Sequence, residues 1–165
     1  MAQFAGLMPR LDPYARSFNA ERAARVSMPR RTLREDGRST GLSVLVLHKD
    51  RPDLLKRLWL GFDKLWEVCD RSGIEIELLL GDTGSTDSET LALLDAPPRG
   101  VDVTRGMRYQ FSRCNNDLFE QARYSTVLFM NNDVFIDECP EGVVEVFQTF
   151  TKDPSLGAVG VVLLF

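Results

Sequence analysis

The chain has 165 residues, of which 44% are hydrophobic and 27% charged, and its formal net charge is −4. This composition is typical of one soluble globular domain, long enough to bury a core without a disulfide or a structural metal. An acidic chain is a poor nucleic-acid binder, because neutralising phosphates supplies most of the non-specific affinity, so we expect no nucleic-acid partner.

The cysteines and the apolar runs indicate where the protein resides. Cys69, Cys114 and Cys139 lie far apart, with His48 as the single imidazole, which argues against a zinc site and favours reduced thiols and a cytoplasmic location. No apolar run reaches the roughly 20 residues needed to cross a bilayer, so no transmembrane segment is predicted. Peripheral association at the inner membrane face stays open.

Charge is unevenly distributed along the chain. Residues 1–41 carry eight arginines and four acidic residues, so the remainder carries the negative charge. Interspersed acids and prolines favour a solvated Arg-rich N-terminal extension, with one short helix around 19–26, over a nucleic-acid-binding arm. We therefore expect two parts, an extension over 1–41 and a folded domain over 42–165.

From Leu42 to Thr104 the pattern alternates between strand and helix. Apolar runs predict strands at 43–48, 74–80 and 101–104, and helical spacing of apolar residues from Leu54 to Cys69 predicts a helix with Pro52 in its first turn. A second helix is expected after Asp87, where Thr86-x-x-Glu89 fits a capping box.

The pattern continues to the end of the chain. We expect a helix at 112–123, a buried strand at 126–130, a helix at 141–150 and a last apolar strand at 157–165. Strands separated by helices imply right-handed crossovers. The predicted class is α/β, a Rossmann-like, mainly parallel sheet with helices on both faces.

Polar loops follow three of these strands, at 48–53, 82–87 and 131–133. In an open parallel sheet, ligands bind outside the carboxyl ends of the strands, where the strand order reverses. Asp82 and Asp133 should therefore share one edge of the sheet. Taken singly, Asp82 is equally explained by an Asx turn, and Asn131-Asn132-Asp133 by the end of a strand.

Together, the motifs resemble a family 2 glycosyltransferase of the GT-A fold. They are SVLVLHKDRP at 43–52, LLLGDTGSTD at 78–87, VLFMNNDV at 127–134 and DPSLGAVG at 153–160, in the family's order. The resemblance covers about residues 42–165. A dinucleotide-binding Gly-x-Gly fingerprint is absent after the first strand, which argues against a dehydrogenase.

The resemblance implies a site for a nucleotide. Asp82 takes the position that hydrogen-bonds the base, and a carboxylate can accept the imide N–H of uracil or thymine. Gly84 lets the backbone approach the nucleotide, and Ser85 or Thr86 caps the next helix, with Asp87 only a favourable charge in its first turn. The full set of nucleotide-binding candidates is His48, Arg51, Asp82, Gly84, Ser85, Asn116 and Asn132. His48 could equally be a buried residue without a chemical role.

The chain departs from the family pattern at two places between the third strand and the metal motif. Arg108-Tyr-Gln110 and Asn116-Asp-Leu118 stand where the family usually has Asn-x-Gly. Asn115, Asn116 and Arg113 are candidates for contacts there, although a solvated helix surface explains them equally well.

The family's metal motif corresponds to Asn131-Asn132-Asp133, in which the last aspartate is retained. Mg²⁺ or Mn²⁺ prefers few protein oxygens plus substrate phosphates, so Asp133 with help from Asn131 is chemically sufficient. The metal would neutralise charge on the departing nucleoside diphosphate.

The resemblance therefore implies an inverting, metal-assisted transferase that uses a UDP- or dTDP-type sugar donor and a glycan or lipid-linked acceptor. The family's catalytic base lies beyond the metal motif, outside this chain. We accordingly expect a donor-binding half that is inactive alone, and the alternative is a non-catalytic nucleotide-binding or interaction module. A sugar-phosphate nucleotidyltransferase is a third candidate, but LHKDRP at 47–52 lacks the glycines of a phosphate loop.

Overall fold

The computed structural model describes residues 39–153 and 155–160. They belong to the second of two compact units, Arg38–Phe165. The expected N-terminal extension before residue 39, with its helix at 19–26, and residues 161–165 of the expected last strand lie outside the described residues. None of the helices in the described part combines the length and the apolar character that a membrane span needs.

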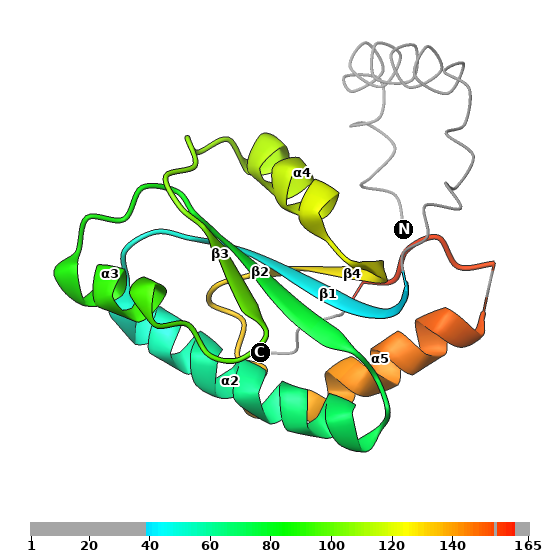
Figure 1. The fold of residues 1–165 in the computed structure, drawn as a ribbon. Helices are drawn as coiled ribbons and strands as arrows, with labels where there is room; N and C mark the ends of the chain where they lie inside the picture. The colour runs from blue at the N-terminus through cyan, green and yellow to red at the C-terminus, as the bar shows by residue number, and fades with distance from the viewer. Residues whose placement is uncertain (1–38, 154, 161–165) are drawn as a thin grey trace, which may run out of the picture. The chain divides into compact units, whose positions relative to one another are not determined.

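Among the described residues, the strands form one four-stranded parallel sheet, which Figure 1 shows. They are β1 (Ser39–His48), β2 (Ile76–Asp82), β3 (Val101–Thr104) and β4 (Tyr124–Asn131), in the spatial order β3-β2-β1-β4. Each neighbouring pair is parallel. The predicted α/β class with a parallel sheet is confirmed, and β1 begins before the boundary that we predicted at Leu42.

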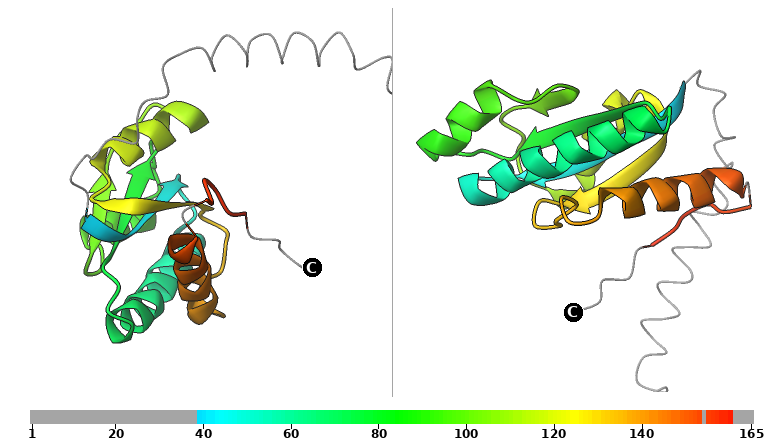
Figure 2. Two further views of the ribbon diagram at one scale, coloured as in Figure 1. Left: turned by 90° about the vertical axis from the view of Figure 1, so that its right-hand side faces the viewer. Right: turned by 90° about the horizontal axis from the view of Figure 1, so that it is seen from below.

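Four helices connect or follow the strands: α2 (Pro52–Arg71), α3 (Ser88–Asp95), α4 (Phe111–Gln121) and α5 (Pro140–Lys152). In Figure 2, α2 and α5 cover one face of the sheet and α4 covers the other. Alternation along β1 explains both layers, because Val44 and Val46 join the larger core with α2 and α5, whereas Leu45 packs with Leu118 of α4.

The helix α2 shows why the sequence folds in this way. Pro52 occupies its first turn, where no backbone N–H is needed, and Asp53 and Arg71 lie at the ends that suit their charges. Its apolar residues recur at helical spacing and are buried against the sheet and α5. The buried members are Leu55, Leu58, Trp59, Gly61, Phe62, Leu65, Val68 and Cys69.

Two predicted strands differ from the structure. The strand that we expected to be buried, β4, is half-buried or exposed along its length, and Phe129 is 55% exposed. Among the described residues β4 has a neighbour on one side only, so it forms an edge of the sheet. Residues 157–160, expected to begin a strand, have no regular secondary structure.

Candidate functional site

The three polar loops meet at the carboxyl edge of the sheet. In the register, His48 is opposite Asp82 on one side of β1, and Leu47 is opposite Asn131 on the other. The chain runs from β1 outward to β2 and β3 and then returns to the far side of β1 to form β4. The strand order therefore reverses between β1 and β4, where open α/β sheets bind ligands.

The loops after β1 and β2 are joined by hydrogen bonds through Asp50. Its backbone N–H donates to Ser85 Oγ at 2.8 Å, and its carboxylate Oδ1 accepts from the N–H groups of Thr86 at 2.7 Å and Asp87 at 2.9 Å. Both N–H groups lower the pKa of Asp50, and that of Asp87 has the larger effect. Asp50 thus braces the rim of the site. Sequence reasoning missed this role, because the residues that it binds are distant in the chain.

Asp82 is 3% exposed, and its carboxylate binds the backbone of its own loop three residues on, rather than two residues on as in an Asx turn. Its Oδ1 accepts from the backbone N–H of Ser85 at 3.0 Å, and its Oδ2 lies 3.6 Å from Arg105 Nε. Gly84, between them, has a φ of 96°, which favours glycine. The carboxylate is thus held by its own loop and by Arg105, a cation that sequence reasoning did not select.

The cap of α3 differs from the prediction. Asp87 is the N-cap residue, and its carboxylate accepts from Thr90 N at 2.8 Å and from Thr90 Oγ1 at 2.9 Å. The predicted capping box of Thr86 with Glu89 is wrong, because the helix begins at Ser88, which makes Thr90 the third helical residue. Glu89 pairs with Lys56 of α2 instead.

His48 is buried at the end of β1, with 1% exposure. Its Nδ1 lies 3.1 Å from the amide nitrogen of Asn132, and its Nε2 has no hydrogen bond in the described structure. Burial lowers the pKa of His48, while the backbone of Asp50 and the carboxylate of Asp82 act in the opposite direction. A neutral ring that accepts from Asn132 at Nδ1 carries its proton on Nε2, which leaves a buried donor without a partner.

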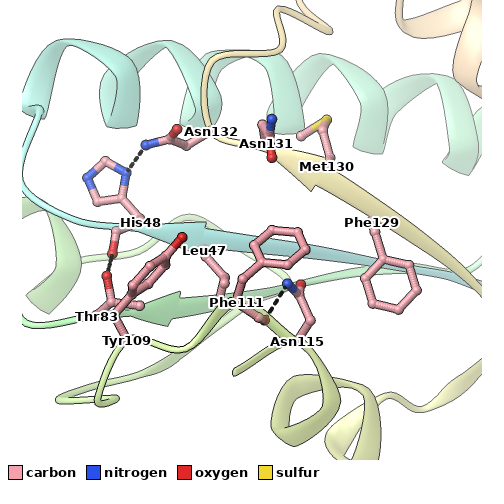
Figure 3. A pocket seen from close by; sticks show the side chains of 10 residues that line it. All are labelled: Leu47, His48, Thr83, Tyr109, Phe111, Asn115, Phe129, Met130, Asn131 and Asn132. Atoms are coloured by element: carbon pink, nitrogen blue, oxygen red, sulfur yellow. Dashed lines mark hydrogen bonds between the residues drawn. The ribbon is translucent and has the colours of Figure 1, made fainter. Parts of the chain in front are cut away.

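An open cavity of about 310 Å³ lies against these loops (Figure 3). Polar groups from β1, α4 and the loop after β4 line it together with three exposed aromatic side chains. The lining residues are Leu47, His48, Thr83, Tyr109, Phe111, Asn115, Phe129, Met130, Asn131 and Asn132. Its size and mixed lining suit a small ligand with a planar ring and polar groups.

The structure brings only some of the predicted residues to this cavity. His48, Asn131 and Asn132 line it, whereas Asp82 and Gly84 lie outside its lining. Of the two neighbouring asparagines that were candidates, Asn115 lines the cavity and its amide donates to Phe111 O at 2.9 Å, whereas Asn116 is exposed on α4.

Two further candidates stand at the surface. Arg51 is exposed and pairs with Asp53 at 2.8 Å, and the charge of Asp133 contributes to raising the pKa of Arg51. Arg113 lies on the surface of α4, with its Nε 3.8 Å from the carboxylate of Asp117. These ion pairs are exposed and leave both arginines accessible to an anionic ligand.

The donor set suits a metal only in the presence of phosphate oxygens. The described residues contain no group of three His, Cys, Asp or Glu side chains that could hold an ion. Asp133 and Asn131 are both exposed. A site with one carboxylate and one amide oxygen fits Mg²⁺ or Mn²⁺ when substrate phosphates complete the coordination.

Comparisons with known proteins agree with the fold. No family model matches the chain. The chain is 36% identical over 126 residues to the O-antigen biosynthesis protein RfbC of Myxococcus xanthus, a match covering 75% of this chain and 9% of RfbC. It superimposes on the crystal structure of S. aureus TarS 1-349 with a TM-score of 0.50 and 18% identity, covering 68% of this chain and 33% of that one.

The chain thus spans a small part of each of these proteins. The likeness to TarS concerns the fold, and the likeness to RfbC concerns the sequence over three quarters of this chain. Both support the resemblance that the motifs indicate. The described residues therefore have the α/β architecture of part of a GT-A fold.

Proposed function

We propose that the chain binds the nucleotide-diphospho-sugar donor of a glycosyltransferase that acts in the synthesis of a polysaccharide or glycoconjugate. The observation that carries this proposal is the cavity where the strand order reverses, lined by His48, Asn115 and Asn132. The similarity to an O-antigen biosynthesis protein supports a biosynthetic role and does not favour a non-catalytic module.

The donor in this proposal is a UDP- or dTDP-sugar. Asp82 accepts the imide N–H of the base, and Gly84 and Ser85 approach the nucleoside through the backbone. Tyr109 and Phe111, exposed at the cavity, offer ring faces for the base or the sugar. His48 Nε2 gains the partner that it lacks in the described structure when a ligand oxygen enters.

The diphosphate lies toward Asp133 and Asn131, which would hold Mg²⁺ or Mn²⁺ together with the phosphates. Such an ion would supply positive charge to neutralise the departing nucleoside diphosphate. Arg51 is a candidate cation from the chain itself, because the charge of Asp133 contributes, after the hydrogen bond to Asp53, to the raised pKa of its guanidinium. A second cation there would share the negative charge of the diphosphate.

Transfer with inversion proceeds by attack of an acceptor hydroxyl, from a glycan or a lipid-linked sugar, on the anomeric carbon. The hydroxyl proton must pass to a base. Asp137 and Glu138 follow Asp133 in the sequence, but both pair with Arg57, so we assign neither as the base.

Calorimetric titration tests the proposal. We expect UDP or dTDP to bind in the presence of Mn²⁺ more tightly than ADP, because the Watson–Crick edge of adenine has no ring N–H to donate to Asp82. Equal affinity for all three would contradict the base assignment. Absence of binding by any of them would contradict the proposed function.

A further inference from the structure

The segment that follows the predicted metal ligand is anchored to α2. After Asp133 the chain runs through residues 134–139 before α5 begins at Pro140. Three side chains of this segment, Phe135, Asp137 and Glu138, contact one arginine of α2, Arg57. We call residues 134–139 the anchored segment.

Arg57 engages the anchored segment by charge and by its planar face. Its Nε lies 3.2 Å from Asp137 Oδ1 and 3.4 Å from Oδ2, and its other end pairs with Glu138. The guanidinium carbon lies 3.5 Å from the centre of the Phe135 ring. Arg57 and Asp137 are 35% and 13% exposed, so this contact is more protected than a surface ion pair.

The adjacent turn of α2 completes the anchor. Lys64 Nζ donates to the carbonyl oxygen of Asp137 at 3.0 Å. Gly61 lets the backbone approach, since a Cβ there would lie 2.8 Å from Ile136 Cγ1 and 3.2 Å from Asp137 N. Helix and segment are therefore in direct contact over consecutive residues.

The turn at Asn131–Val134 is held on both sides, by β4 before it and by the anchored segment after it. Its tip at Asp133 is not held by a side-chain hydrogen bond or ion pair among the described residues. Asn132 is held by His48, and Val134 N donates to Asn131 O at 3.3 Å. Asp133 is exposed and forms no hydrogen bond or ion pair with another described residue. A carboxylate that forms no hydrogen bond or ion pair with the described residues is placed by the chain on either side of it.

We propose that Arg57 is a positioning residue for the donor site. By holding the anchored segment against α2, it keeps Asp133 in the position where the diphosphate and its metal ion would bind. This inference rests on the proposed function. Arg57 acts through the anchored segment and does not touch the ligand. Residues that orient a metal ligand typically change metal affinity about 10- to 100-fold when they are removed.

The test compares Arg57→Ala with Lys56→Ala in the full chain. Lys56 lies beside Arg57 on α2 and pairs with exposed Glu89, so its removal deletes the same charge without touching the anchored segment. Calorimetry measures affinity for UDP or dTDP with Mn²⁺ and for the bare nucleoside without metal. We expect Arg57→Ala to weaken the diphosphate about tenfold and the nucleoside less than twofold, and Lys56→Ala to change neither.

A second variant perturbs the same contact without changing charge. Gly61→Ala pushes the anchored segment away from α2, and we expect the same selective loss of diphosphate affinity. This variant decides the matter if Arg57→Ala does not fold. Arg57→Lys should recover part of the affinity, because it keeps the charge but loses the two-pronged contact.

Hydrogen exchange of the unliganded protein gives a readout independent of binding. The amides of residues 132–139 should exchange faster in Arg57→Ala than in Lys56→Ala. Unchanged diphosphate affinity in both Arg57→Ala and Gly61→Ala, or an equal loss for diphosphate and nucleoside, overturns the positioning role. If the wild type binds no nucleotide, the proposed function itself fails, and unchanged exchange then overturns the anchor as well.

Discussion

Two polar clusters flank β1 and β2, and they differ in how completely their groups are paired. Near the amino ends of β2 and β4, the fully buried carboxylate of Glu77 accepts from Ser43 Oγ at 2.6 Å, from Arg123 N at 2.6 Å and from Arg123 Nε at 2.5 Å. At the carboxyl edge, His48 Nε2 is buried without a partner and Asp133 is exposed without one among the described residues.

This difference in pairing distinguishes a cluster that stabilises the fold from a cluster that can bind a ligand. A buried charge whose hydrogen bonds are all made within the protein stabilises the fold and has nothing left to offer a ligand. A buried donor without a partner costs stability, and that cost is recovered when a ligand supplies an acceptor. Mutations at the Glu77 cluster should therefore change stability, whereas mutations at the site should change binding.

Removal of the Glu77 carboxylate should have the largest effect. Glu77→Ala leaves the Ser43 hydroxyl and the Arg123 amide without their acceptor and should lower the free energy of unfolding by about 3 kcal/mol. Urea denaturation measures this change. Asp102→Ala removes an exposed partner of Arg123 and should cost less than about 0.5 kcal/mol. Equal losses would show that burial does not distinguish the two carboxylates.

Asp82→Ala should have the next largest effect, on binding. Loss of a charge-assisted hydrogen bond of about 2 kcal/mol weakens UDP or dTDP roughly 30-fold. Asn116→Ala serves as the control, because Asn116 is exposed and outside the cavity lining, and it should change affinity less than twofold. Equal calorimetric affinities of the two variants would remove Asp82 from the base site and leave it as a turn residue.

Asp133→Asn should change metal-dependent binding of the diphosphate while leaving the free energy of unfolding almost unchanged. Because Asp133 is exposed and unpaired with any described residue, its replacement should change the unfolding free energy by less than about 0.5 kcal/mol. The enhancement of diphosphate binding by Mn²⁺ should fall about tenfold, a coupling of about 1.4 kcal/mol, while nucleoside binding stays unchanged. An unaltered Mn²⁺ effect would place the metal elsewhere.

The smallest effect concerns pH. Since burial lowers the pKa of His48 in the folded state, the unfolded chain binds more protons as the pH falls through about 6.5, and stability falls with it. His48 is the single histidine, so His48→Gln removes this contribution specifically. Thermal unfolding at pH 7.5 and 5.5 should show a smaller loss for His48→Gln than for the wild type. Identical losses would mean that folding does not lower the pKa of His48.

Much of the fold could be predicted because its signals are local. Apolar runs and helical spacing located the strands and helices of the described core, and Pro52 marked the start of α2. The cap of α3 was predicted wrongly, since Thr86 and Asp87 are both good caps and the choice depends on where Asp50 binds the loop. The exposure of β4 was missed because burial depends on which strands lie beside it.

The site was predicted in part for the same reason. Polar residues at the ends of the predicted strands made His48, Asp82 and the Asn131–Asp133 motif candidates, because parallel strands bring their carboxyl ends to one edge. By itself, then, the sequence determined most of the elements, their order and the polar loops that meet at the carboxyl edge of the sheet. Only the tertiary structure decided which side chains are paired and which line the cavity. It places Asn115 rather than Asn116 in the cavity lining, and it pairs Arg57 with the anchored segment. The physical reason is that hydrogen bonds and ion pairs depend on distances between residues far apart in the chain, which no local pattern encodes.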